Sequence, residues 1–223
     1  MTDDGSRVIG VGFSLYGDPT EPRAFAWIAS WSAVDGSLLT VRPMDDDEYF
    51  NPLFSPDGGT LAVAGAREDV RLLDPETLEE LARLEMIQPR RLAFSSDGSL
   101  LAAASDTSET TVFNLATRGA IHRFRSSFDV DFTQDGTKLP TADADRVVRL
   151  WELNSGAEIQ AIPGAADFAR FVDDDRRYLT AAQGHISVMT LDIDELFEIG
   201  ASRLSREMND AECEKYLGAP CGG

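Results

Sequence analysis

Two histidines, two cysteines and a few acidic runs are the residues of this chain whose types could bind a metal or support catalysis. His122 and His185 have no cysteine close in sequence, so zinc-ligand spacing is absent, and we expect both to be surface or turn residues. Cys213 and Cys221 lie near the C-terminus, where we expect reduced thiols, with Cys213 on an apolar helix face and a redox switch as the alternative.

The acidic runs and the glycine-rich start do not fit known ligand-binding motifs. The runs "MDDDEYF" (44–50) and "DDDRR" (173–177) lack the Asp-x-Asp-x-Asp-Gly register of a calcium loop, and solvated loops are the favoured interpretation. The stretch "GVGFSLYG" from Gly10 matches neither a dinucleotide fingerprint nor a phosphate loop, and no Gly-x-Ser-x-Gly elbow is present. The sequence therefore predicts no catalytic, metal-binding or cofactor-binding residues, and no cofactor.

Charge and hydropathy narrow the class of protein further. A formal net charge of −19 over 223 residues repels nucleic acid and anionic membranes, so neither is an expected partner. No apolar stretch approaches the roughly 20 residues of a membrane-spanning helix, and "MTDDGSRVIG" does not resemble a signal peptide. We expect a cytoplasmic protein.

A repeat explains how the rest of the chain is organised. Four related stretches, "FSPDGGTLAVAG", "FSSDGSLLAAAS", "FTQDGTKLPTAD" and "FVDDDRRYLTAA", follow one another at spacings of 40, 38 and 39 residues. They begin at Phe54, Phe94, Phe132 and Phe171. Each Phe is expected to pack between units, and each Asp-Gly pair to form a turn in which Gly adopts a positive φ. Three short apolar stretches follow each turn, which predicts four short strands per unit and no helix.

Four antiparallel strands repeated at this period are typical of a β-propeller blade, whose two apolar faces must be covered by neighbours. We predict an all-β propeller of about five four-stranded blades over 1–193, with units at 7–43, 44–86, 87–126, 127–164 and 165–193. From Asp192 the sequence loses strand alternation, which predicts a helical C-terminal tail over 194–223. One helical face would carry Ile193, Leu196, Phe197, Gly200 and Leu204.

The third strand of each unit carries a resemblance to a known family. It ends at Trp31, Leu73, Phe113, Trp151 and Met189. The stretch "ADADRVVRLWELNSGAEI" resembles the third-strand signature of WD-repeat proteins, with Asp145 six residues before Trp151. The resemblance covers about residues 7–193, and "SRLSREMNDAECEKYLGAPC" resembles the end segment of bacterial WD-repeat proteins. No unit has the family's Gly-His pair between blades, so only a partial network of Asp145 and Trp151 is implied.

Strand counting predicts that the terminal units are incomplete. The first and last units supply three strands each, which gives eighteen in total, and the ring is expected to stay open. Pro140 lacks a backbone donor inside a strand, so a bulge or poor pairing is expected there. Two solutions for the exposed ends stay open: the tail folds over one of them, or a second chain packs against them.

The resemblance favours a non-enzymatic scaffold or adaptor that binds proteins, such as the C-terminal sensor part of a bacterial signalling protein. One alternative is a propeller hydrolase or lyase with an axial site, and another is a degenerate fragment that needs an upstream repeat partner. Binding is expected on the loops between second and third strands and between units. The candidate contact residues are Glu68, Asp69, Arg90, Arg91, Glu109, Arg125, Asp143 and His185.

Overall fold

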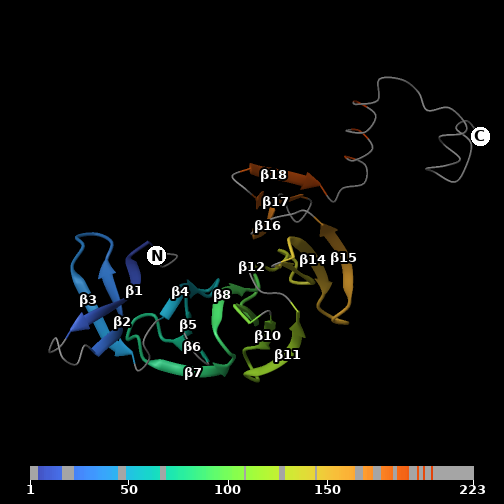
Figure 1. Ribbon diagram of the computed structural model, residues 1–223. Coiled ribbons are helices and arrows are strands. Elements are labelled where there is room, and N and C mark those ends of the chain that lie inside the picture. Colours follow the sequence, from blue (N-terminus) through green and yellow to red (C-terminus); the bar gives the residue numbers. More distant parts are fainter. Residues whose placement is uncertain are drawn as a thin grey trace, which may run out of the picture. The chain divides into compact units, whose positions relative to one another are not determined.

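The structure, a computed structural model, divides the chain into two compact units, Met1–Met189 and Thr190–Gly223 (Figure 1). It describes residues 5–16, 23–44, 49–65, 69–107, 109–125, 129–143, 145–163, 168–172, 177–182 and 185–190, and the single positions 195, 198 and 202. Glu195, Glu198 and Ser202 are helical, and the rest of the predicted tail, with Cys213 and Cys221, lies outside the described residues.

The described residues of the first unit form eighteen strands in five antiparallel sheets, which we number I to V in chain order. Sheet I contains β1 (Arg7–Tyr16), β2 (Arg23–Ser32) and β3 (Leu38–Met44). Sheet II contains β4 (Tyr49–Phe54), β5 (Leu61–Gly65), β6 (Asp69–Leu73) and β7 (Glu80–Glu85). Sheet III contains β8 (Pro89–Phe94), β9 (Leu100–Ser105), β10 (Thr110–Asn114) and β11 (Gly119–Phe124).

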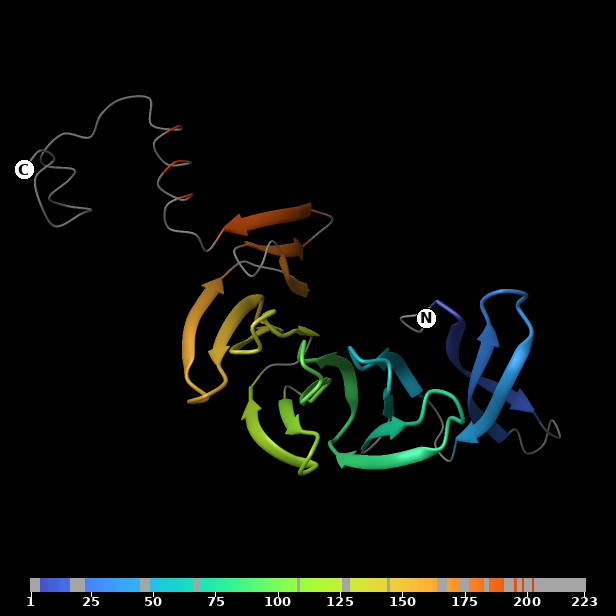
Figure 2. The ribbon, with the colours of Figure 1, turned by 180° about the vertical axis from the view of Figure 1, so that it is seen from behind.

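Sheet IV contains β12 (Asp129–Val130), β13 (Lys138–Ala142), β14 (Val147–Glu152) and β15 (Glu158–Pro163). Sheet V contains β16 (Phe168–Val172), β17 (Arg177–Ala182) and β18 (His185–Thr190). In every sheet the strands lie side by side in chain order (Figure 2). The predictions of an all-β fold and of four-stranded antiparallel units are therefore confirmed for sheets II to IV.

The Asp-Gly turns form as predicted, because the residues around them satisfy their own polar groups. In sheet II, Asp57 Oδ1 accepts hydrogen bonds from Ser55 Oγ at 2.6 Å and from the Gly59 amide at 3.0 Å. Gly58 has a φ of 69°, a conformation that glycine adopts without steric cost. The turns that contain Asp97 and Asp135 have the same arrangement, so one local motif joins the first and second strands of three sheets.

A shared irregularity identifies the equivalent strands of different sheets. The pairing between the last two strands shifts register at Ser30/Trp31, Leu72/Leu73, Val112/Phe113 and Leu150/Trp151. This places β2, β6, β10 and β14 at the same position in their sheets, as the sequence spacing predicts. It follows that sheet I consists of a second, a third and a fourth strand and lacks a first.

The core of the first unit lies between consecutive sheets, in three clusters of buried apolar side chains. One joins sheets I and II around Ile28 and Leu61, another joins sheets II and III around Leu72 and Leu101, and the third joins sheets III and IV. Phe54 and Phe94 pack against two of these clusters, and Phe132 is buried in the third. Phe171 belongs to β16, but its side chain lies outside the described residues. Each interface thus combines side chains from both neighbouring sheets.

Poor pairing is found beside Pro140, as expected. β12 is only two residues long and pairs at Asp129 with Ala142 and at Val130 with Thr141. The Pro140 carbonyl accepts a hydrogen bond from the Asp131 amide at 3.2 Å. The nitrogen of Pro140 also faces the first strand, but it carries no hydrogen and so cannot donate the second hydrogen bond of an antiparallel pair. The missing donor shortens the first strand of sheet IV.

Sheet packing runs between neighbours in the chain. Among the described strands, β1 packs against β4, β5 against β8, β9 against β12, and β13 against β16. No closed ring is found, because no such packing joins sheet I to sheet V within the described part of the chain.

Candidate interaction surface

The sequence-predicted contact residues gather at one edge of the sheets. The β5–β6, β9–β10 and β13–β14 turns lie at this edge, together with the β7–β8 and β11–β12 connections, because the strands alternate in direction. We call it edge A; the Asp-Gly turns lie at the opposite edge B. Asp69 begins β6, Glu109 directly precedes β10 and Asp143 directly follows β13, so all three are at edge A.

Of the remaining predicted contact residues, three arginines are described and exposed, and the other two lie wholly or partly outside the described residues. Arg91 and Arg125 are exposed, in β8 and just after β11. Arg90 is also exposed and pairs with Asp106 of the β9–β10 turn at 2.5 Å. Glu68 lies outside the described residues, as does the side chain of His185, whose backbone begins β18.

In sheet II, a buried arginine in the middle of β6 lies between Asp69, at edge A, and Glu80, at the start of β7. Arg71 is only 3% exposed and lies 3.4 Å from Asp69 and 3.7 Å from Glu80. Arg83 pairs with the same two carboxylates from the solvent side. Two carboxylates therefore compensate a guanidinium that would be costly to bury alone.

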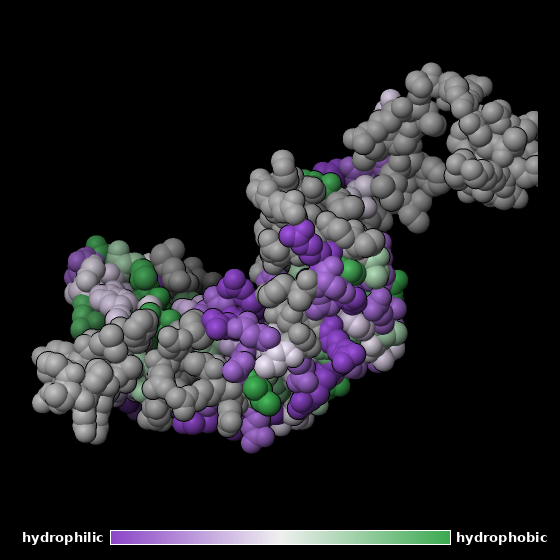
Figure 3. All heavy atoms as spheres, viewed as in Figure 1, coloured by the Kyte–Doolittle hydropathy of each residue, from purple (hydrophilic) through white to green (hydrophobic). Residues whose placement is uncertain are grey.

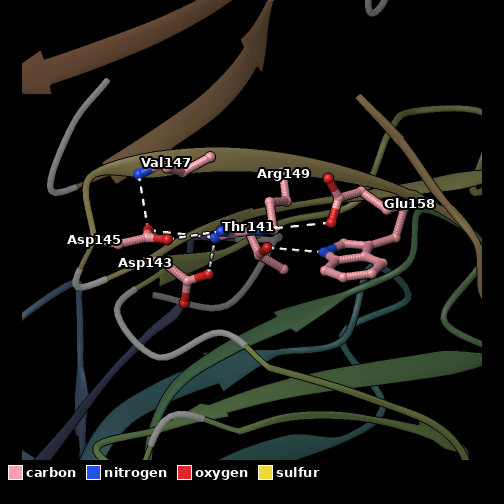
Figure 4. Close-up of polar contacts among 7 residues, drawn as sticks. Thr141, Asp143, Asp145, Val147, Arg149 and Glu158 are labelled. Atoms are coloured by element: carbon pink, nitrogen blue, oxygen red, sulfur yellow. Dashed lines mark hydrogen bonds and ion pairs between the residues drawn. The ribbon is translucent and has the colours of Figure 1, made fainter. Parts of the chain in front are cut away.

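Sheet IV has a similar cluster around Arg149, which pairs with Asp143, with Asp145 at 2.6 Å and with Glu158 at 3.6 Å (Figure 4). Asp145 also accepts a hydrogen bond from the Val147 amide at 3.0 Å. The hydrogen bond from Arg149 holds the pKa of Asp145 below its ordinary value. The Asp145 carboxylate and the Arg149 guanidinium therefore both stay charged at neutral pH.

The partial network of Asp145 and Trp151 takes a different form in the structure. Trp151 Nε1 donates to Thr141 Oγ1 at 2.9 Å, whereas Asp145 pairs with Arg149 (Figure 4). The Trp151 ring also stacks on Phe124 of sheet III, with a centroid distance of 4.6 Å. Trp151 therefore links two sheets, and Asp145 belongs to the ionic cluster of edge A.

Between sheets II and III, edge A is hollowed. A cavity of about 530 Å³ is lined by Glu85, Met86, Ile87, Thr107, Glu109 and Arg123. Arg123 Nη1 lies 3.1 Å from Glu109 Oε1, and the Ile87 side chain is 63% exposed. The hollow therefore combines an exposed apolar side chain with an ion pair on its wall.

Sequence reasoning found Glu109 but missed the other residues of this hollow and the two central arginines. The repeat itself offered a signal for some of them. Positions 40 residues apart relate Asp69 to Glu109 and Arg83 to Arg123, so charge recurs at edge A with the same period as the phenylalanines. Ile87 gave no such signal, because the connections between units do not repeat.

One expectation about the histidines is wrong. His122 lies in β11, half-buried, and its Nε2 donates to the Leu153 carbonyl of sheet IV at 2.5 Å. It stacks on Phe124 as well, so it is an interface residue rather than a surface or turn residue. Within the ranges that the structure describes, no three His, Cys, Asp or Glu side chains converge as a metal site requires. The acidic runs at 45–48 and 173–176 fall outside those ranges.

Four-stranded antiparallel meanders that repeat along the chain and pack face to face define an all-β repeat protein. The sequence comparison then specifies the kind of repeat. An uncharacterised WD repeat-containing protein of Synechocystis sp. is 30% identical over 145 residues, which cover 58% of this chain and 40% of that relative. The chain is thus homologous to a WD repeat-containing protein, and the resemblance in its sequence is confirmed.

The match spans well under half of the relative's length. No family model matches the chain. None of the helical positions that the structure describes belongs to a helix long and apolar enough to cross a membrane.

Proposed function

We propose that this chain is a non-enzymatic interaction module that binds a protein partner through edge A of sheets II and III. The observation that carries the proposal is the hollow in which exposed Ile87 lies beside Glu85 and the Glu109–Arg123 pair. WD-repeat proteins generally bind protein partners and are generally non-enzymatic, which supports the same assignment.

The chemistry of the hollow indicates what kind of partner fits. An apolar side chain of the partner would contact Ile87 and Met86, whose polar surroundings exclude water from the contact. The carboxylates of Glu85 and Glu109 and the overall charge of −19 favour a basic surface around that anchor. We infer a partner segment with one large apolar residue flanked by lysine or arginine.

The test is retention of a partner by the purified chain from an extract, compared between the wild type and matched variants. Ile87→Glu removes the apolar contact and Glu109→Lys repels a basic partner, so each should reduce retention of the same protein roughly tenfold or more. Ile159→Glu is the control, because Ile159 is an exposed isoleucine on β15, which begins at edge B. Equal retention by all four proteins, or loss only in the control, would contradict binding at edge A.

The five sheets support a propeller as the architecture behind this function. In this proposal the blades correspond to residues 7–43, 44–86, 87–126, 127–164 and 165–193, and residues 194–223 form a helical tail. Meander order and the packing of each sheet on the next support it. A chain ending at Asp192 should lose the helical signal in far-ultraviolet circular dichroism while its β signal stays; retention of the helical signal would overturn the tail. The proposed setting is cytoplasmic, within a bacterial signalling protein.

A further inference from the structure

Sheet I leaves uncovered an apolar face that every other comparable sheet buries. Val8 of β1 pairs with Trp31 of β2. In sheets II, III and IV, a leucine of the second strand pairs with the third-strand residue that is equivalent to Trp31, so Val8 is equivalent to these leucines. Those pairs are Leu61 with Leu73, Leu101 with Phe113, and Leu139 with Trp151. The three leucines are 0% exposed because the preceding sheet covers them, whereas Val8 is 43% exposed.

Two tryptophans extend this face. Trp27 and Trp31 lie over Gly12 and Gly10 of β1, where a Cβ would come within 2.5 and 3.0 Å of the indole rings. Opposite Ala29, which lies between them on β2, Val41 of β3 is 54% exposed. We call the surface formed by Val8, Trp27, Trp31 and Val41 the front face of sheet I. Hydrophobic side chains are visible over β1–β3 at the left of Figure 3.

The opposite side of sheet V carries an exposed valine. In the third strands of sheets II to IV, the residues that directly precede Leu73, Phe113 and Trp151 are all buried. They are Leu72, Val112 and Leu150. Leu72 and Val112 belong to the clusters that contact the following sheet. Val188 is the equivalent residue in β18, because it directly precedes Met189 at the same repeat spacing, and it is 60% exposed. We call this side of sheet V its back face.

The two uncovered faces are complementary by the geometry of the repeat. At each interface inside the chain, the back of one sheet packs against the front of the next. Among the described residues, exposed apolar side chains mark the front of sheet I and the back of sheet V, and no packing between these two sheets is found among the described strands. We propose that the front face of sheet I packs against the back face of sheet V of a second copy, head to tail.

Such an interface is heterologous, so it joins copies into a closed ring or an open chain of copies rather than into a two-fold dimer. Its burial of Val8, Trp27, Trp31 and Val188 stabilises the assembly, whereas the charge of −19 on each copy opposes it. Added salt therefore strengthens the association, because it screens the repulsion between copies. This association is independent of partner binding at edge A.

The test is the molar mass of the full chain in solution, measured by light scattering over a range of protein concentrations. The wild type should exceed the monomer mass of 24.3 kDa, at least twofold at the highest concentration, and more so at higher salt. Val8→Glu and Val188→Glu should each weaken association roughly tenfold or more, because each would bury an unpaired carboxylate. Val34→Glu is the control: Val34 is 89% exposed in the β2–β3 turn, outside both faces.

Mixing the two variants provides the decisive result. Val8→Glu keeps an intact back face and Val188→Glu an intact front face, so an equimolar mixture should form a dimer of one copy of each, whereas each variant alone stays monomeric. Both variants should keep the circular dichroism spectrum of the wild type, which checks that they are folded. A mixture that stays monomeric would overturn the head-to-tail interface, as would a wild type that is monomeric at all concentrations. If both substitutions also lowered the thermal midpoint of that monomer, the two faces would close within one chain.

Discussion

Sheets I and III contain equivalent strands in different surroundings, and the difference shows how far neighbours determine the state of a residue. In sheet III, residues 101–105 of β9 are all buried, because sheet II covers one face and sheet IV the other. In sheet I, none of the described side chains of β1 is buried, since only sheet II packs against it. How deeply a strand is buried therefore depends on how many of its two faces a neighbouring sheet covers, and the sizes of the side chains differ accordingly.

The adaptation is visible in composition. β9 reads Leu-Leu-Ala-Ala-Ala-Ser, with small side chains that let two neighbouring sheets approach. β1 has Gly10 and Gly12 at front-face positions, and the rings of Trp27 and Trp31 fill the space above them. Sheet I thus covers part of its own free face with aromatic rings, which sheet III does not need to do.

The largest expected effect that distinguishes the two sheets comes from the equivalent residues Leu101 and Val8. Leu101→Ala should lower the free energy of unfolding by about 3 kcal/mol, because it leaves a cavity between two sheets. Val8→Ala should cost less than about 1 kcal/mol, because Val8 has little packing to lose. Urea denaturation at low protein concentration measures both. Equal losses would mean that the front face of sheet I is covered even in the monomer.

Tryptophans at equivalent third-strand positions offer a second contrast. Trp151→Ala should cost about 3 kcal/mol, since it removes the stack on Phe124 and the hydrogen bond to Thr141. Trp31→Ala should cost about 1 to 2 kcal/mol, because the contacts of the Trp31 ring among the described residues are with Gly10 and Trp27 of its own sheet. Thermal unfolding ranks the two variants, and a larger loss for Trp31 would contradict the assignment of a free front face.

Acid sensitivity should depend on the turn between the first and second strands, which sheets II to IV have and which sheet I, without a first strand, lacks. Hydrogen bonds from Thr133 Oγ1, then from the Thr137 amide and hydroxyl, lower the pKa of Asp135 to about 2. Since this folded-state pKa is below the unfolded value of 3.8, the turn contributes stability above about pH 4 that is lost as the pH falls towards 2.

Asp135→Asn keeps an oxygen acceptor but cannot titrate, so its thermal midpoint should fall less between pH 5 and pH 2.5 than that of the wild type. An Asp35→Asn variant, in the β2–β3 turn of sheet I, is the matched comparison, because the pKa of Asp35 is also lowered, by hydrogen bonds from Ser37. Identical pH profiles for the wild type and Asp135→Asn would show that the Asp135 turn does not contribute to acid sensitivity.

The smallest expected effect concerns a buried hydroxyl. Ser30 Oγ in sheet I is buried and has no hydrogen-bond partner among the described residues, while the equivalent residues of sheets II to IV are Leu72, Val112 and Leu150. Ser30→Ala should therefore leave stability unchanged or raise it by up to about 1 kcal/mol. Ser105→Ala should instead cost about 1 kcal/mol, because Ser105 Oγ bonds Thr107. A loss in Ser30→Ala as large as in Ser105→Ala would indicate that the Ser30 hydroxyl is satisfied.

Much of the fold could be predicted from the sequence, because its signals are local. The Asp-Gly turn at Asp57 requires only residues 55–60, and the strand number follows from short apolar stretches between such turns. The effect of Pro140 was predictable for the same reason, since a missing amide acts on its nearest partner strand. The WD-repeat resemblance was clearest in the unit around Trp151 and in the end segment 202–221.

The candidate site was less predictable. The repeat period located Asp69, Glu109 and Asp143 at edge A, but their arginine partners follow from strand pairing and sheet twist. His122 was misplaced because its partner, the Leu153 carbonyl, belongs to the next sheet.

The sequence by itself therefore determined the repeat, its turns and the strand content of each unit, because these depend on residues a few positions apart. Only the tertiary structure decided which of several equivalent apolar residues is buried. Leu61, Leu101, Leu139 and Val8 occupy the same place in their sheets, and the presence or absence of a preceding sheet separates them. The hydrophobic effect acts on the area removed from water, and that area depends on neighbours distant in the chain.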